Sequence, residues 1–216
     1  MKPTVAFLKW VLLVSLCASA RADVYVSTLD QAPIGSLNIG SDYWVGTSFI
    51  TGTNPGGYVL DSVQLQMNSL MGTPGDFSVS IYNQAGPPVF GPGTNLANLG
   101  GVNPSAAGLY SYSGTDVSLL PSTPYFVVAT SDALLTEGYY LGSTGFGNSE
   151  RSDDGWIINL GFFSSADGQN WQYARQSTFR MAVAATAVPE PSTFVLIGLG
   201  GLWLGARFRK RRSGGG

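Results

Sequence analysis

The chain offers few of the side chains on which enzyme chemistry usually depends. It contains no histidine, and its one cysteine, Cys17, lies inside an N-terminal apolar run. Serine–histidine and cysteine–histidine arrangements are therefore excluded for the region that follows, and so are zinc or copper sites built on these residues. A disulfide within the chain is excluded as well. Carboxylates are the reactive groups that remain, and no cofactor or metal is implied.

The densest group of carboxylates is formed by Glu150, Asp153 and Asp154, just before Trp156. Two such groups could act as the acid and base of a glycoside hydrolase, or the segment could hold Ca²⁺ beside an indole that stacks on a sugar. The alternative is a solvated turn in which Arg151 offsets part of the charge. A calcium loop places oxygen ligands at alternating positions, and this segment does not. We favour the solvated turn and keep glycan contact by Trp156, Asp153 and Asp154 as a speculative alternative.

Aromatic residues raise the same choice between a binding surface and a core. The side chains of Trp44, Trp156 and Trp171 could stack on sugars, but sandwich cores also bury such rings, and we favour a place in the core. Residues 165–171 resemble the Asp-box hairpin of sialidases, although one residue is missing between the aspartate and the glycine. We interpret Asp167-Gly168 as a turn and Trp171 as the start of a packed strand.

These candidate residues must be positioned by β-strands, because the clearest pattern alternates apolar and polar side chains. The alternation is strict over residues 63–68 and is repeated over 77–81 and 179–183. Residues 125–130 are continuously apolar, which predicts a central strand, and no stretch keeps the helical period of about 3.6 residues. Weaker strand candidates are 24–27, 44–50, 109–113, 117–119, 139–141, 156–160 and 171–174.

Turn signals separate these strand candidates. Clusters of glycine with proline, asparagine or aspartate occur at 54–57, 72–76, 86–88, 91–93 and 167–168. Short strands at this spacing predict an all-β fold, a two-sheet antiparallel β-sandwich that is jelly-roll-like.

Charge is divided unevenly along the chain. Residues 23–188 hold twelve acidic residues against three arginines and no lysine, and most basic residues lie at the two ends. An acidic body repels phosphate backbones, so nucleic acid is not an expected partner.

The N-terminus has the parts of a secretory signal peptide. Two lysines give a positive start, residues 10–16 are apolar, and small residues at 18–20 or 20–22 offer cleavage sites. An uncleaved anchor is the alternative, but the apolar run is short. A lipid anchor on Cys17 would need a small residue before it, where Leu16 stands.

The C-terminus has three parts in order. Residues 188–192 break regular structure, because proline fixes φ and removes a donor; they are Val188, Pro189, Glu190, Pro191 and Ser192. Residues 193–206 are uncharged and mostly apolar, and as a helix they would span about 21 Å of a hydrocarbon core of about 30 Å. A basic cluster then predicts a stop-transfer segment with a cytoplasmic end; it contains Arg207, Arg209, Lys210, Arg211 and Arg212. A solvated or nucleic-acid-binding tail is the alternative for this cluster.

This order resembles the PEP-CTERM sorting signal, in which Pro-Glu-Pro precedes a transmembrane helix and an arginine-rich end. The resemblance implies an exosortase-type sorting enzyme as partner and export through the inner membrane. It also implies a membrane-anchored stage facing the periplasm, followed by the cell surface or extracellular matrix. The expected domains are a signal peptide at 1–22, the sandwich at 23–186, the sorting signal at 187–212 and a disordered tail at 213–216.

The body resembles the choice-of-anchor exported domains, most of all their type R form. The matching stretches are 48–52, 58–63, 79–83, 117–119 and 123–128, in this order. The resemblance implies a surface location and no established chemistry.

These observations predict a non-enzymatic, structural or adhesive protein of the envelope or the exopolysaccharide matrix. A carbohydrate-binding module, with or without Ca²⁺, is the alternative. A carboxylate-dependent glycoside hydrolase is a more distant one, and it would need two carboxyl groups about 5–10 Å apart across a groove.

Overall fold

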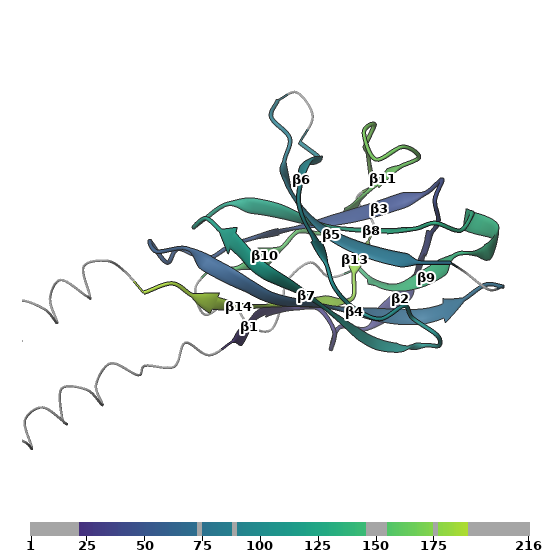
Figure 1. The fold of residues 1–216 in the computed structure, drawn as a ribbon, viewed down its shortest axis with the longest axis horizontal. Coiled ribbons are helices and arrows are strands. Elements are labelled where there is room, and N and C mark those ends of the chain that lie inside the picture. Colours follow the sequence, from purple (N-terminus) through teal and green to yellow (C-terminus); the bar gives the residue numbers. More distant parts are fainter. Residues whose placement is uncertain (1–21, 73–74, 88–89, 146–154, 175–176, 190–216) are drawn as a thin grey trace, which may run out of the picture.

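The computed structural model describes residues 22–72, 75–87, 90–145, 155–174 and 177–189. These residues form fourteen β-strands in two antiparallel sheets, with one short 3₁₀ turn, η1 (Leu135–Glu137) (Figure 1). The all-β class and the two antiparallel sheets are as predicted, and a sandwich fits them. The jelly-roll-like winding stays a prediction. Within the described residues no helix is long and apolar enough to cross a bilayer. The predicted signal helix and transmembrane helix lie outside them.

The first sheet is organised around its longest strand. Its members are β1 (Asp23–Ser27), β2 (Pro33–Ile39), β4 (Tyr58–Leu70), β7 (Gly108–Leu119), β9 (Tyr139–Thr144), β13 (Thr178–Phe179) and β14 (Met181–Ala187). The central strand β4 pairs with β7, β14 and β9. β1 then pairs with β14, and β2 with β9.

The second sheet has the order β12-β11-β3-β8-β5-β6, with β10 also paired to β3. Its members are β3 (Trp44–Ile50), β5 (Phe77–Gln84), β6 (Pro92–Leu99), β8 (Pro124–Ser131), β10 (Ile157–Ile158), β11 (Phe162–Ser165) and β12 (Gln172–Ala174). β8 lies between β3 and β5, so the apolar run at 125–130 is central, as predicted.

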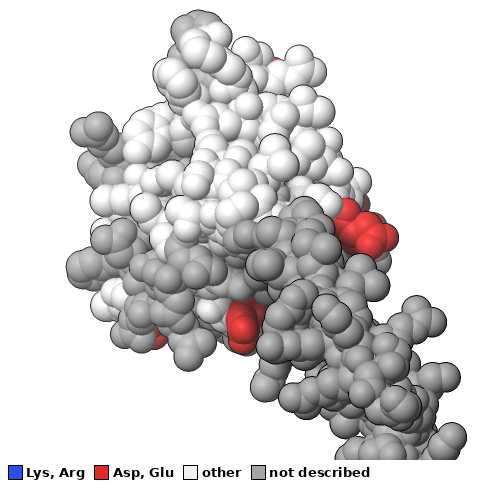
Figure 2. Space-filling model, turned by 90° about the vertical axis from the view of Figure 1, so that its left-hand side faces the viewer, with Lys and Arg blue, Asp and Glu red and all other residues white. Residues whose placement is uncertain are grey.

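Both ends of the described body lie at the same end of the sandwich. Asp23 pairs with Ala185, and Tyr58 pairs with both Ala187 and Leu119. We call this end, with the turns at 54–57 and 120–123, the terminal pole; it lies at the left of Figure 1. Figure 2 faces this pole, where the described surface is mostly uncharged, with a few separate acidic groups. The opposite end, with turns at 40–43, 132–138 and 166–170, is the far pole.

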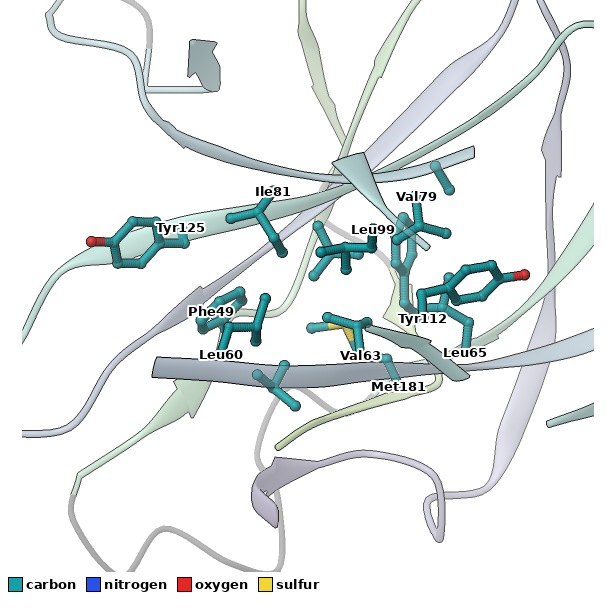
Figure 3. Close-up of a cluster of buried hydrophobic side chains, with 14 of the residues drawn as sticks. Phe49, Leu60, Val63, Leu65, Val79, Ile81, Leu99, Tyr112, Tyr125 and Met181 are labelled. Carbon is teal, nitrogen blue, oxygen red and sulfur yellow. The ribbon is translucent and has the colours of Figure 1, made fainter. Parts of the chain in front are cut away.

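The core lies between the inner faces of the two sheets. Val63 and Leu65 of β4 alternate with more exposed polar residues, and they face Val79 and Ile81 of β5 (Figure 3). These four side chains are at most 1% exposed. Apolar and polar residues therefore alternate in the sequence because each of these strands buries one face.

Several boundaries differ from the sequence prediction. The two strands expected at 109–113 and 117–119 are one strand, β7, whose register shifts opposite Leu60–Ser62 while Asp116 adopts a φ of 59°. The strand expected at 179–183 is broken at Arg180, which bridges β9 and β4 through its backbone. Such irregularities leave the apolar pattern intact, so the pattern alone does not reveal them.

Three strands were not predicted, namely β2, β6 and β11. The turn expected at 91–93 is in part a strand, because β6 begins at Pro92. β6 is the last strand of its sheet, and a proline is tolerated at the first residue of an edge strand. Glycine, proline and asparagine in β2 and β6 gave a turn-like composition to what are strands.

Candidate functional site

The carboxylate cluster proposed from the sequence is not placed by the structure. Glu150, Asp153 and Asp154 lie outside the described residues. Among the residues that are described, no group of three or more acidic, histidine or cysteine side chains could hold a metal ion. The hydrolase and calcium hypotheses therefore stay predictions.

The structure corrects the interpretation of Trp156 as a sugar-stacking residue. The side chain is 1% exposed, whereas a stacking platform must be open to solvent. Its indole is stacked between the rings of Tyr25 and Phe49, with centroids 5.0 and 5.7 Å away. Tyr58 adds an edge-on contact at 4.9 Å. Trp156 is therefore part of the core at the terminal pole, which is the interpretation favoured from the sequence.

A second group of aromatic residues lies on the outer face of the second sheet. Tyr82, Phe126 and Val128 are buried there, and three half-buried rings pack against them: Trp44, Phe163 and Trp171. The rings of Phe126 and Phe163 meet edge to face at 5.2 Å, and Phe163 and Tyr173 lie 4.9 Å apart. We call the six rings of Trp44, Tyr82, Phe126, Phe163, Trp171 and Tyr173 the outer aromatic cluster.

A glycine in β3 makes room for this cluster. Gly46 pairs with Phe163 on one side and Val128 on the other. A Cβ at Gly46 would lie 3.3 Å from the side chains of Pro92 and Val128, and 3.6 Å from Trp171. The cluster can therefore pack closely against β3 at this position, because Gly46 carries no side chain.

The most exposed ring of the cluster is that of Tyr173. Its side chain is 52% exposed, and its hydroxyl donates a hydrogen bond to the Leu160 carbonyl at 2.9 Å. An exposed ring fixed by one hydrogen bond next to half-buried indoles is a surface on which sugar C–H groups can stack. Tyr82, Phe126, Phe163 and Tyr173 were not identified from the sequence. On β5 the alternation that turns Val79 and Ile81 inward places Tyr82 on the opposite face, and this signal could have found it.

The turn after β11 is held by one carboxylate. Asp167 accepts backbone N–H bonds from Gln169 at 2.9 Å and Asn170 at 2.8 Å, and a hydroxyl bond from Ser165 at 2.9 Å. These bonds, led by the one from Asn170, hold the pKa of Asp167 well below its usual range. These bonds all come from residues of the turn, so the structure agrees with the predicted turn at Asp167-Gly168.

The start of the sorting signal is fastened to the body at the terminal pole. The N–H of Val188 donates to the Gly57 carbonyl at 3.0 Å. The amide of Asn54 donates to the carbonyls of both Val188, at 3.0 Å, and Gly57, at 2.6 Å. We call residues 54–57 together with Val188 the clasp. The sequence predicted the turn at 54–57, but its contact with Val188 spans more than a hundred residues and leaves no local signal.

Two glycines make the clasp possible. Gly57 has a φ of 73°, and a Cβ there would lie 2.6 Å from the Leu119 carbonyl oxygen. At Gly56 a Cβ would collide with the Val188 carbonyl oxygen. Only glycine combines this φ with so close an approach of two backbones. Of the predicted sorting residues, Val188 and Pro189 belong to the described residues, and Glu190, Pro191, Ser192 and the basic cluster do not.

Comparison with known proteins gives one family match. Residues 187–212 match the PEP-CTERM protein-sorting motif, so the tail carries the predicted sorting signal. The match to choice-of-anchor domains is not confirmed, and no curated protein matches the chain.

Among solved structures, the cysteine protease and lectin-like domains of Cwp84 give a match. Cwp84 is a surface layer associated protein of Clostridium difficile. The sequence identity is 13% and the TM-score is 0.46, over 68% of this chain. The aligned part spans about a third, 33%, of the length of that structure.

Proposed function

We propose that this chain is an exported protein whose β-sandwich has a structural or adhesive, non-catalytic role at the bacterial surface. The signal peptide directs export, and an exosortase-type enzyme sorts the chain through residues 187–212. The single observation that carries the proposal is the PEP-CTERM motif in that segment. After sorting, the sandwich is delivered to the cell surface or to the exopolysaccharide matrix.

The place of the motif on the body supports this function. β14 ends at Ala187, and the motif begins at the same residue. The folded domain is therefore joined to its sorting signal without an intervening linker. The basic cluster after residue 206 keeps the tail end in the cytoplasm and the sandwich outside before sorting.

The composition of the body supports a non-catalytic role. It contains neither histidine nor cysteine, and its acidic excess disfavours contact with phosphate backbones. The choice-of-anchor resemblance suggests the same kind of protein, in which one exported domain is combined with a surface anchor.

The experiment that tests the sorting proposal replaces Pro189-Glu190-Pro191 by alanines in the full chain. We expect loss of processing and accumulation of unprocessed protein in the inner membrane, measured by fractionation and immunoblotting. The matched control replaces Ser213-Gly214-Gly215 by alanines in the same tail and should be sorted normally. Unchanged surface delivery and processing of the Pro-Glu-Pro variant would mean that the tail is only an anchor.

A second candidate function is carbohydrate binding through the outer aromatic cluster. The observation that favours it is the half-exposed Tyr173 beside the half-buried Trp171. Tyr173→Ala and Trp171→Ala should abolish glycan-array binding, whereas Tyr140→Ala on the other sheet should not. Binding that is lost on chelation would add Ca²⁺ to this hypothesis. A folded chain that binds no glycan would rule it out.

A further inference from the structure

The turn between β7 and β8 holds an apolar side chain out into solvent at the terminal pole. Leu120 is 64% exposed. Its backbone is fixed, because its N–H donates to the Tyr125 hydroxyl at 2.9 Å and its carbonyl accepts from the Thr51 hydroxyl at 2.6 Å. The N–H of Ser122 donates to the Gly52 carbonyl at 2.8 Å. The turn therefore cannot fold Leu120 back into the core without breaking these bonds.

Two more exposed apolar side chains belong to the same end of the sandwich. Ile157 is 42% exposed and pairs with Ile50, which in turn pairs with Pro124 beside the turn. Val24, near the start of β1, is 37% exposed. The terminal pole thus has an apolar rim around the place where the chain leaves the body, within the mostly uncharged surface of Figure 2.

The clasp places this pole close to the membrane anchor. Only Pro189, Glu190, Pro191 and Ser192 separate Val188 from the apolar segment that begins at Thr193. Four residues reach at most about 14 Å when fully extended. The headgroup layer on each side of the hydrocarbon core is roughly 5–8 Å thick and takes up part of this length. The terminal pole must therefore lie at the headgroups while the tail is inserted.

Charge favours the same orientation. The turns of the far pole carry Asp42, Asp76, Asp132, Glu137 and Asp167. Asp42 accepts the Leu135 N–H, and the Asp132 N–H donates to the Asp76 carbonyl, which brings these acids to one end. Arg180 is the one basic residue among those the structure describes, and its side chain donates to the Leu29 carbonyl. The terminal end carries fewer acidic residues, namely Asp23, Asp61 and Asp116, so anionic lipid repels the far pole more strongly than the terminal pole.

We propose that the terminal pole rests on the lipid surface, with Leu120 entering the headgroup region as an apolar wedge. The proposal rests on the proposed function, in which the tail holds the chain in the inner membrane. Exposed apolar side chains also occur at the far pole, such as Leu134, which is 60% exposed. Acidic neighbours and distance from the anchor separate that residue from the membrane, so it serves as a matched reference.

The test uses the full chain without its signal peptide, which contains no cysteine once Cys17 has been removed. Leu120→Cys and Leu134→Cys variants are labelled with one fluorophore and inserted in vesicles of phosphatidylethanolamine and phosphatidylglycerol. We expect brominated lipids to quench the fluorophore at position 120 and to leave the fluorophore at position 134 unquenched. A water-soluble quencher should give the opposite order.

Three results would overturn the proposal. Equal quenching at the two positions would show that the terminal pole has no preferred contact with the lipid. Shielding of position 120 only after addition of the sorting enzyme would assign this face to that protein instead. A chain that does not enter the vesicles at all would contradict the proposed anchoring itself, and this outcome is recognised by flotation before any quenching is measured.

Discussion

The two poles of the sandwich differ in what their turns are made of. At the terminal pole the turns carry an exposed leucine, Leu120, and two backbones clasped through Asn54 and two glycines. At the far pole the turns carry acids that accept hydrogen bonds, either within one turn, as at Asp167, or from another segment, as at Asp42. One end is built to hold the chain's exit, and the other is built to remain in solvent. The two ends of this one fold therefore present different chemistry to their surroundings.

The core beneath each pole differs as well. Under the terminal pole, Trp156 is stacked between Tyr25 and Phe49. Under the far pole, the Phe77 ring meets Tyr139 at 4.8 Å. Burial raises the pKa of Tyr139, and the nearby Asp132 raises it further. Each pole has its own aromatic support, so each can be weakened separately.

The largest expected effect comes from removing the support of the terminal pole. Trp156→Ala empties the site between three rings and should reduce the free energy of unfolding by about 3–5 kcal/mol. Trp171→Ala, on the half-buried outer cluster, should cost less than half as much. Urea unfolding followed by circular dichroism measures both variants. Equal losses would contradict the distinction between core and outer face.

A smaller effect is expected where the clasp needs a glycine. Gly57→Ala forces a φ of 73° on a residue with a Cβ, 2.6 Å from the Leu119 carbonyl oxygen. Strain of this kind costs on the order of 1–3 kcal/mol. The matched control is Gly86→Ala, where a Cβ meets nothing within 4 Å and φ is ordinary. Thermal unfolding of the two variants should separate them, and a stable Gly57→Ala would argue against a strained clasp.

Removing the side chain of the clasp should act locally. Asn54→Ala deletes one hydrogen bond within the turn, to Gly57, and one to the distant Val188, at a cost of about 1–2 kcal/mol. Faster hydrogen exchange is expected at the Val188 amide. Asn68→Ala also deletes two bonds, to Gly35 and Ser36, but at the opposite end of β4 from the clasp. If Asn68→Ala accelerated exchange of the Val188 amide as much as Asn54→Ala does, the Asn54 bonds would not specifically hold Val188.

The smallest effect is expected in the Asp167 turn. Its pKa is lowered in the folded state, so the turn is stabilised at pH values above the ordinary carboxyl pKa of about 4. This stabilisation is lost as pH falls through that value towards the folded pKa. Protection of the Asn170 amide from exchange should therefore fall on acidification, while the Asn159 amide, bonded to Ser48, should be unaffected. Asp167→Asn should remove the pH dependence.

Strands that bury one regular face were predictable from the sequence. β4 and β5 were predicted because apolar and polar residues alternate along them, and β8 because both of its faces are buried. β2 and β6 were not predicted because they contain glycine, asparagine and proline, which are typical of turns. The apolar pattern of a strand reflects its packed face, and an edge strand has little packed surface.

The positions of the candidate site residues were less predictable. Trp156 and Trp171 belong to the same residue type and similar local contexts, yet one is buried and the other half-buried. The difference in burial depends on which face of the sheet their partners occupy, and those partners lie far away in the chain. The contact between Asn54 and Val188 is equally distant, so only the fold reveals it.

The central claim is that the signal peptide and the sorting tail are both removed, and that the sandwich between them is the form that reaches the cell surface. Intact mass spectrometry of the protein recovered from the surface of the native bacterium tests it most directly. The account predicts an N-terminus after Ala20 or Ala22 and a C-terminus that lacks the basic residues Arg207 to Arg212. A surface form that retains the complete tail would contradict it.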